Sequence, residues 1–84
     1  LRTLKINSNE IGSLNLNSFY DLRNLIDLYL NKNHIEIIKK GSFFGLGNLK
    51  KLDLGSNLIK LIEREGFYGL TNLSELDLSW QKIR

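Results

Sequence analysis

The chain has 84 residues, of which 42% are hydrophobic and 25% are charged, and its formal net charge is +3. It contains no cysteine, which excludes thiol chemistry and disulfides, and no apolar run approaches the roughly 20 residues that a membrane-spanning helix needs. Its lysines alternate with acidic residues, which indicates a solvated surface and not a basic stripe for nucleic acid.

One pattern of apolar residues restarts every 24 residues along the chain. Its starts are Leu1, Leu25, Leu49 and Leu73. From each start the spacing L-x-x-L-x-L-x-x-N-x-I follows, with Gln81 in place of the last Asn. Such self-similarity is typical of a stacked array in which each unit is a short strand and a return segment. The pattern divides the chain into repeats 1–24, 25–48 and 49–72 and a partial repeat 73–84.

Each repeat begins with a predicted strand. In the second repeat Leu28 and Leu30 alternate with Asp27, Tyr29 and Asn31, which is the two-residue period of a strand with one buried face. One such strand cannot bury its leucines alone, but parallel strands stacked about 4.8 Å apart bury a continuous row. We therefore expect a parallel sheet of about four short strands.

The second half of each repeat is predicted to turn and return to the sheet. Asn9, Asn33 and Asn57 follow the strands, where a buried Asn can bond backbone groups that the bend leaves unpaired. Gln81 takes this position in the fourth repeat and suggests that the repeat is degenerate. Each return segment then places one phenylalanine and one leucine in the interior. These are Phe19, Phe43 and Phe67, with Leu22, Leu46 and Leu70. Glycines nearby favour irregular or 3₁₀ turns over long helices.

The array resembles the typical, 24-residue subtype of the leucine-rich repeat family over its whole length. Similar repeats build Toll-like receptor ectodomains, Slit proteins, small leucine-rich proteoglycans and insect immune proteins. The resemblance implies an α/β solenoid, a right-handed coil with a concave parallel sheet and an irregular or 3₁₀ convex side. It also implies an extracellular binding scaffold, either secreted or part of a single-pass membrane protein. The usual cysteine-bearing caps are absent, so we expect an excerpt of a longer ectodomain that, in isolation, is marginally stable or self-associates through its open ends.

Candidate ligand-binding residues are the strand positions that point away from the core, which form three rows across the sheet. The first row is Thr3, Asp27, Lys51 and Glu75; the second is Lys5, Tyr29, Asp53 and Asp77; the third is Asn7, Asn31, Gly55 and Ser79. From these rows we select Lys5, Asp27, Tyr29, Lys51, Asp53, Glu75 and Asp77 as the ligand-binding set. Because the exposed residues differ between repeats, the rows favour recognition over a spacer role.

Each of these residues also has a plainer interpretation. Tyr29 suits a protein hot spot, but it is equally an ordinary exposed strand residue. Asp27, Lys51 and Glu75 alternate in sign and can support one another across strands. Asp53 and Asp77 should lie one strand spacing apart, where two like charges favour a cation or a basic partner. Two carboxylates are a weak metal signal, so no metal or other cofactor is predicted.

Several residues outside the strands are secondary candidates. Trp80 flanks the last strand, where it either anchors a partner or covers neighbouring leucines. Tyr20, Phe44 and Tyr68 form another row, for which packing is favoured over contact. Asn72 begins the glycosylation sequon Asn72-Leu73-Ser74, but it also belongs to a row with Asn24 and Asn48 that has a structural explanation.

The function classes can now be separated. His34 is the only histidine, and no partner set for a catalytic triad or a zinc site accompanies it, so an enzyme is not expected. A protein ligand is favoured, whereas nucleic acid and glycan ligands have no support in the pattern. The alternative function is a structural spacer that sets the curvature between binding regions elsewhere, and a bacterial or intracellular array is the alternative location.

Overall fold

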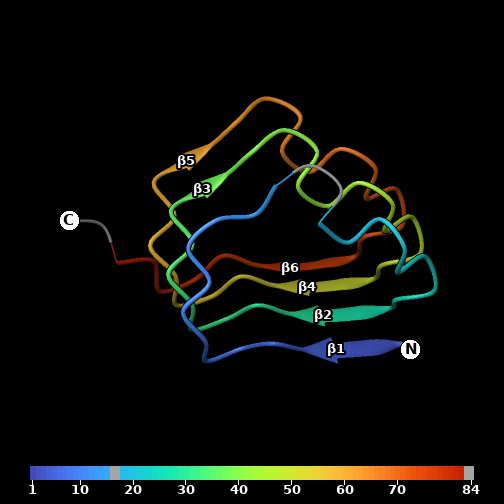
Figure 1. Ribbon diagram of the computed structural model, residues 1–84, viewed down its shortest axis with the longest axis horizontal. Coiled ribbons are helices and arrows are strands. Elements are labelled where there is room, and N and C mark those ends of the chain that lie inside the picture. Colours follow the sequence, from blue (N-terminus) through green and yellow to red (C-terminus); the bar gives the residue numbers. More distant parts are fainter. Residues whose placement is uncertain (16–17, 83–84) are drawn as a thin grey trace.

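The chain forms one continuous coil of stacked repeats in a computed structural model that describes residues 1–15 and 18–82. Ile83, the last residue of the repeat pattern, lies outside the described residues. The first strands of the four repeats form a parallel sheet in the order β1 (Thr3–Lys5), β2 (Asp27–Tyr29), β4 (Lys51–Asp53) and β6 (Glu75–Asp77). These strands lie side by side in Figure 1. The predicted four-stranded parallel sheet is therefore confirmed.

The register of this sheet follows the repeat period. Leu4 pairs with Leu28, Leu28 with Leu52, and Leu52 with Leu76, so every pairing joins residues that are 24 apart. Leu28 and Leu52 are fully buried, whereas Leu76 in the last strand is 40% exposed. The first two rows of outward-pointing residues predicted from the sequence share this register, whereas the third row lies just beyond the paired strands.

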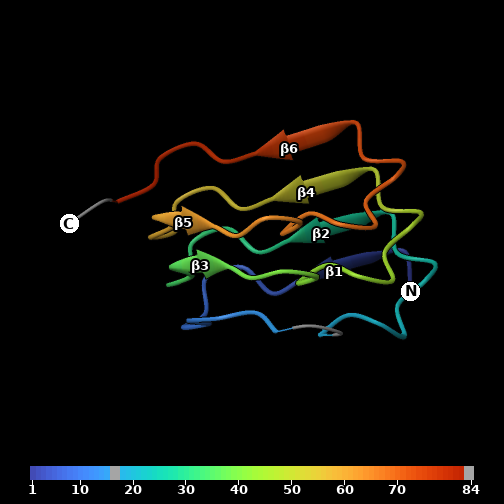
Figure 2. The same cartoon turned by 90° about the horizontal axis from the view of Figure 1, so that it is seen from above.

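A second sheet, which the repeat pattern did not predict, lies on the opposite side of the coil. It pairs β3 (Ile37–Ile38) with β5 (Leu61–Ile62) in parallel, and Figure 2 shows the two strands stacked like the repeats themselves. Each of these strands has two adjacent apolar residues, too few to show the alternation that reveals a strand. Ile38 is fully buried, whereas Leu61 and Ile62 are 51% and 43% exposed.

The interior contains rows of like side chains from successive repeats. Phe19 stacks on Phe43 with ring centroids 6.0 Å apart, and Phe43 stacks on Phe67 at 5.8 Å. Phe43 is fully buried, and its ring lies between the rings of the two neighbouring repeats. The prediction that each return segment places a phenylalanine in the core is confirmed for Phe19 and Phe43, whereas Phe67 is partly buried and packs against the core.

The asparagine row connects the repeats by hydrogen bonds. Asn57 is fully buried; its Nδ2 donates to the carbonyl oxygens of Leu30 at 3.1 Å and Leu54 at 2.9 Å, and its Oδ1 accepts from the Ile35 amide at 3.1 Å. Asn33 repeats these contacts one turn earlier, donating to Leu30 at 2.9 Å and accepting from the Ile11 amide.

The two ends of this row differ from expectation. Asn9 is exposed, because only one side of the first repeat is covered by another repeat. Gln81 donates its Nε2 to the Leu54 carbonyl at 2.8 Å and accepts from the Ile59 amide at 3.0 Å. Its longer side chain therefore makes the same bridge as Asn, and the suggestion of a degenerate repeat at this position was wrong.

Apart from β3 and β5, the convex side consists of turns, as predicted. Amides donate to carbonyls three residues earlier, for example Phe44 to Gly41 at 3.0 Å and Tyr68 to Glu65 at 3.1 Å, and the described residues contain no helix. Within 1–15 and 18–82, therefore, no helix is of a kind that could cross a membrane. Glu65 has a φ of 62°, a left-handed conformation that Gly41 adopts at the equivalent position of the previous repeat.

Candidate functional site

The exposed side of the four-stranded sheet brings the candidate ligand-binding residues together. In the middle row Lys5, Tyr29 and Asp53 are register neighbours, and Asp77 follows on β6. The Nζ atoms of Lys5 and Lys51 lie 5.7 Å and 5.1 Å from the centroid of the Tyr29 ring. Ammonium groups at such distances are attracted to the electron-rich face of an aromatic ring. Tyr29 thus lies between two positive charges, an arrangement that the sequence alone did not predict.

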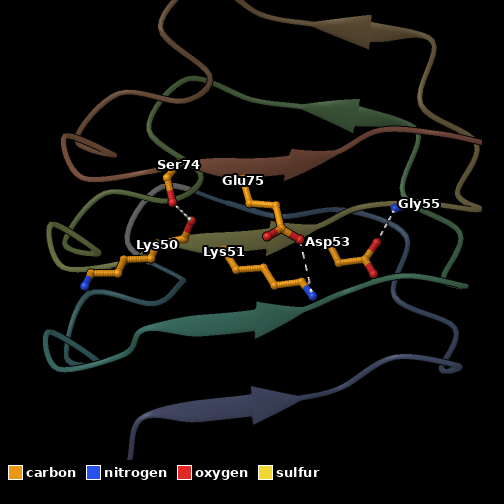
Figure 3. Close-up of polar contacts among 6 residues, drawn as sticks. All are labelled: Lys50, Lys51, Asp53, Gly55, Ser74 and Glu75. Carbon is orange, nitrogen blue, oxygen red and sulfur yellow. Dashed lines mark hydrogen bonds and ion pairs between the residues drawn. The ribbon is translucent and has the colours of Figure 1, made fainter.

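Lys51 also joins the third and fourth repeats. Its Nζ lies 3.4 Å from a carboxylate oxygen of Glu75 on the neighbouring strand (Figure 3). Tyr29, and after it Glu75, raises the pKa of Lys51, so the ammonium form is favoured. Asp27 is different, because it accepts a hydrogen bond from the Thr3 hydroxyl at 3.3 Å. Of the predicted ladder of alternating charges, the structure thus contains the ion pair between Lys51 and Glu75, whereas Asp27 bonds to Thr3.

Asp53 and Asp77 lie in register, and each carboxylate is held by the turn that follows its strand. The Gly55 amide donates to Asp53 Oδ1 at 2.9 Å (Figure 3), and the Ser79 amide donates to Asp77 Oδ1 at 2.8 Å. A Cβ at Gly55 would lie 3.2 Å from Asp53 Oδ1 and 3.5 Å from Asp77 Oδ1, so glycine keeps the space between the two carboxylates open. Backbone amides thus donate hydrogen bonds to the two carboxylates for which the sequence analysis considered a cation or a basic partner.

The described part of the chain holds no group of three or more His, Cys, Asp or Glu side chains arranged to bind a metal ion. Asp77 is further stabilised by the Ser79 hydroxyl, which donates to Oδ1 at 2.6 Å. This hydroxyl first, and then the Ser79 amide, lowers the pKa of Asp77 below its usual value. The lowered pKa keeps the Asp77 carboxylate charged at neutral pH.

The replacement Ser79→Ala is expected to raise the pKa of Asp77 toward its usual value, because the hydroxyl donor is lost and only the amide remains. Since the folded-state pKa is lowered, the stability that Asp77 contributes is fully present above its usual pKa and is lost as the pH falls through the folded-state pKa. A carboxyl ¹³C NMR titration measures the shift directly. The matched control Ser74→Ala should leave the Asp77 titration unchanged, and an unchanged titration in the Ser79 variant would contradict the assignment.

The secondary candidates occupy three different places. Trp80 is 83% exposed, so it does not cover neighbouring leucines in this structure. Tyr20, Phe44 and Tyr68 stack on one another with centroids 6.0 Å and 5.8 Å apart, which supports packing, although Tyr20 and Tyr68 remain more than half exposed. Asn72 is exposed and donates its Nδ2 to the Gly47 carbonyl at 2.7 Å.

A groove that the sequence analysis missed runs along the flank of the coil, just beyond the C-terminal ends of the strands. Lys32, His34 and Glu36 line it from the second repeat, Leu58 from the third, and Lys82 from the fourth. These residues lie in the bends after the strands, where no alternating pattern marks the exposed positions. The repeat period was the signal that could have found them. Aligning the equivalent bend positions of successive repeats, as was done for the strand positions, would have placed these residues side by side.

Comparison with known proteins agrees with this geometry. The family model described as leucine rich repeat matches residues 1–47 and 27–83. A solved structure, described as the crystal structure of a TLR13–ssRNA13 complex, has a chain that is 34% identical and superposes with a TM-score of 0.94. The match covers 98% of the present chain and 12% of that chain. No curated protein sequence matches. The register, the asparagine bridges and the family match together show that the chain belongs to the leucine-rich repeat family.

Proposed function

We propose that this chain is a recognition module that binds a macromolecular ligand, most favourably a protein, on the concave four-stranded sheet. The observation that carries the proposal is a contrast between two adjacent rows. The row that contains the buried Leu28 and Leu52 is leucine in all four strands, whereas the middle row on the other face is Lys5, Tyr29, Asp53 and Asp77. A constant scaffold with a variable exposed row is suited to recognition, while a spacer needs no such variation.

The chemistry of the exposed sheet supports a protein ligand. Tyr29 offers a large amphipathic ring held between two ammonium groups, and aromatic residues of this kind dominate protein hot spots. Asp53 and Asp77 form an acidic region beside it, oriented by the amides of Gly55 and Ser79. The surface therefore presents a positive side and a negative side that can discriminate between partners.

Nucleic acid is the second candidate ligand, because the similar solved chain comes from a complex of TLR13 with single-stranded RNA. The ligand-binding set on the concave sheet contains four carboxylates and only two ammonium groups. Such a balance disfavours a phosphate backbone, whose binding depends on neutralisation by lysine and arginine. For this face we therefore place a protein ligand first.

We further propose that the chain belongs to the 24-residue subtype of the family, since all three pairings of the larger sheet join residues 24 apart. With this subtype we propose an extracellular setting, which the resemblance implies. On this proposal the chain is part of a larger receptor, immune or adhesion protein and has no enzymatic activity or cofactor. Asn72 would be a glycosylation site in such a setting, because its side chain is exposed, and one amide hydrogen would still reach the Gly47 carbonyl after modification.

A binding screen against extracellular proteins and polyanions tests the proposed function. Saturable binding to a protein should weaken by about tenfold or more in each of the variants Tyr29→Ala, Asp53→Ala and Asp77→Ala, as expected for hot-spot residues. Tyr68→Ala is the matched control, because it removes an exposed aromatic ring from the convex side. Binding that ignores all three concave variants would contradict this site, and the absence of any binding partner would favour the spacer.

A further inference from the structure

The flank groove differs in charge from the concave sheet beside it. Glu36, its one acidic lining residue, pairs with Lys60 at 3.1 Å. Lys32 and Lys82 also line the groove, and neither belongs to an ion pair within residues 1–15 and 18–82. Since Glu36 is already paired, these two ammonium groups give the groove an uncompensated positive charge. The half-buried Leu58 adds apolar surface between them.

Trp80 lies in the row that borders this groove. Ser8, Lys32 and Ser56 occupy the same position in the earlier repeats, and all four residues are left-handed, with a φ of 60° at Trp80. The amide of Ser56 donates to the Ser79 carbonyl at 2.9 Å, which places Trp80 beside the groove-lining Ser56.

Neither its backbone conformation nor its burial explains why this residue is tryptophan. A bulky residue in the left-handed region is energetically unfavourable, and the Trp80 side chain is 83% exposed, so it contributes little to the core. Strain of this kind persists at contact sites, and tryptophan is enriched among residues that anchor protein partners.

We propose that the flank groove is a second binding surface, one that takes an extended acidic segment of a protein. Carboxylates of the segment pair with Lys32 and Lys82, and its apolar side chains pack against Leu58 and Trp80. A protein segment fits better than a nucleic acid, because two unpaired lysines fall well short of the roughly 6 to 10 phosphate contacts typical of nucleic-acid binding.

The single tryptophan of the chain allows a direct test. The 84-residue chain is titrated with an octapeptide of alternating glutamate and leucine, and the emission of Trp80 is recorded. Saturable binding with a blue shift is expected, because the indole moves from water into an apolar contact. The variants Lys32→Glu and Lys82→Glu should each weaken this binding by about tenfold, since they place like charges together.

Two controls separate the alternatives. Lys50→Glu makes the same charge change at a lysine that directly precedes β4, at the N-terminal end of the strands, and whose side chain extends away from them (Figure 3). This variant should leave the affinity unchanged. Asp53→Ala should also have no effect, which keeps this surface distinct from the concave site. An octapeptide of alternating lysine and leucine should not produce the blue shift of Trp80.

Three results would overturn the proposal. The first is the absence of a saturable blue shift with the acidic peptide. The second is an equal loss of affinity in the Lys50 variant, which would mean non-specific charge attraction. The third is tighter binding of a short oligouridylate with quenching and no blue shift, which would assign the groove to nucleic acid.

Discussion

The replacement Phe43→Ala is expected to lower the free energy of unfolding by about 3 to 5 kcal/mol, the range for truncating a fully buried aromatic side chain. Phe43 is 0% exposed, and its ring lies between those of Phe19 and Phe67 at 6.0 Å and 5.8 Å, so the change removes the middle of a continuous stack. A small core supplies stability of similar size, so the variant should be largely unfolded at 25 °C, as measured by urea denaturation.

Two further variants make this expectation specific. Phe43→Leu retains most of the apolar volume and should remain folded, with a loss of about 1 kcal/mol. Phe44→Ala removes the central ring of the neighbouring stack, which is only half-buried, and should cost about 1 kcal/mol. If Phe43→Ala were no more destabilising than Phe44→Ala, the buried stack would not be the main packing element of the convex side.

The large sheet and the exposed rows were predictable because both follow from one number, the repeat period. Once Leu28 and Leu52 are known to be equivalent, parallel stacking places Asp27 beside Lys51 and Tyr29 beside Asp53. The stacked phenylalanines follow in the same way. A repeat array therefore converts sequence alignment within the chain directly into contacts between neighbouring turns.

The side-chain partners within the rows could not be predicted in the same way. A period places Lys51 near Asp27, Tyr29 and Glu75 equally, and only the side-chain conformation decides that Lys51 contacts Tyr29 and Glu75. The amides that donate to Asp53 and Asp77 belong to residues two positions later in the chain. They lie in turns whose backbone conformation the repeat period does not reveal. The bond between Gln81 and the Ile59 amide likewise depends on side-chain reach, which a comparison of residue types does not reveal.

The second sheet and the flank groove escaped prediction for related reasons. β3 and β5 are each two residues long, and their adjacent apolar residues show no strand period. The groove is built from bends that contain left-handed residues such as Lys32 and Ser56. Non-glycine residues rarely adopt this conformation, so sequence gives little warning of it. The bends and the two-residue strands of this repeat array thus need the structure, whereas the strands of the larger sheet do not.

The replacement Asn57→Ala should lower the free energy of unfolding by about 3 kcal/mol, because it leaves several buried backbone groups without partners. Asn57 is 0% exposed, accepts from the Ile35 amide, and donates to the carbonyls of Leu54 and Gly55 at 2.9 Å and 3.2 Å. Urea denaturation measures the loss. The matched control is Asn9→Ala in the first repeat, which removes an exposed side chain and should cost about 1 kcal/mol or less.

The variant Asn57→Asp separates hydrogen bonding from side-chain volume. It retains the acceptor for the Ile35 amide but places an introduced carboxylate against the carbonyl oxygens of Leu30 and Leu54, to which Asn57 donates. Burial and these oxygens disfavour the charged form and raise its folded-state pKa, so this variant should become more stable as the pH falls from the raised pKa toward the usual pKa of an aspartate. A variant as stable as the natural chain at neutral pH would show that the donor bonds of the asparagine row contribute little, and that stacking of leucine and phenylalanine alone holds successive repeats together.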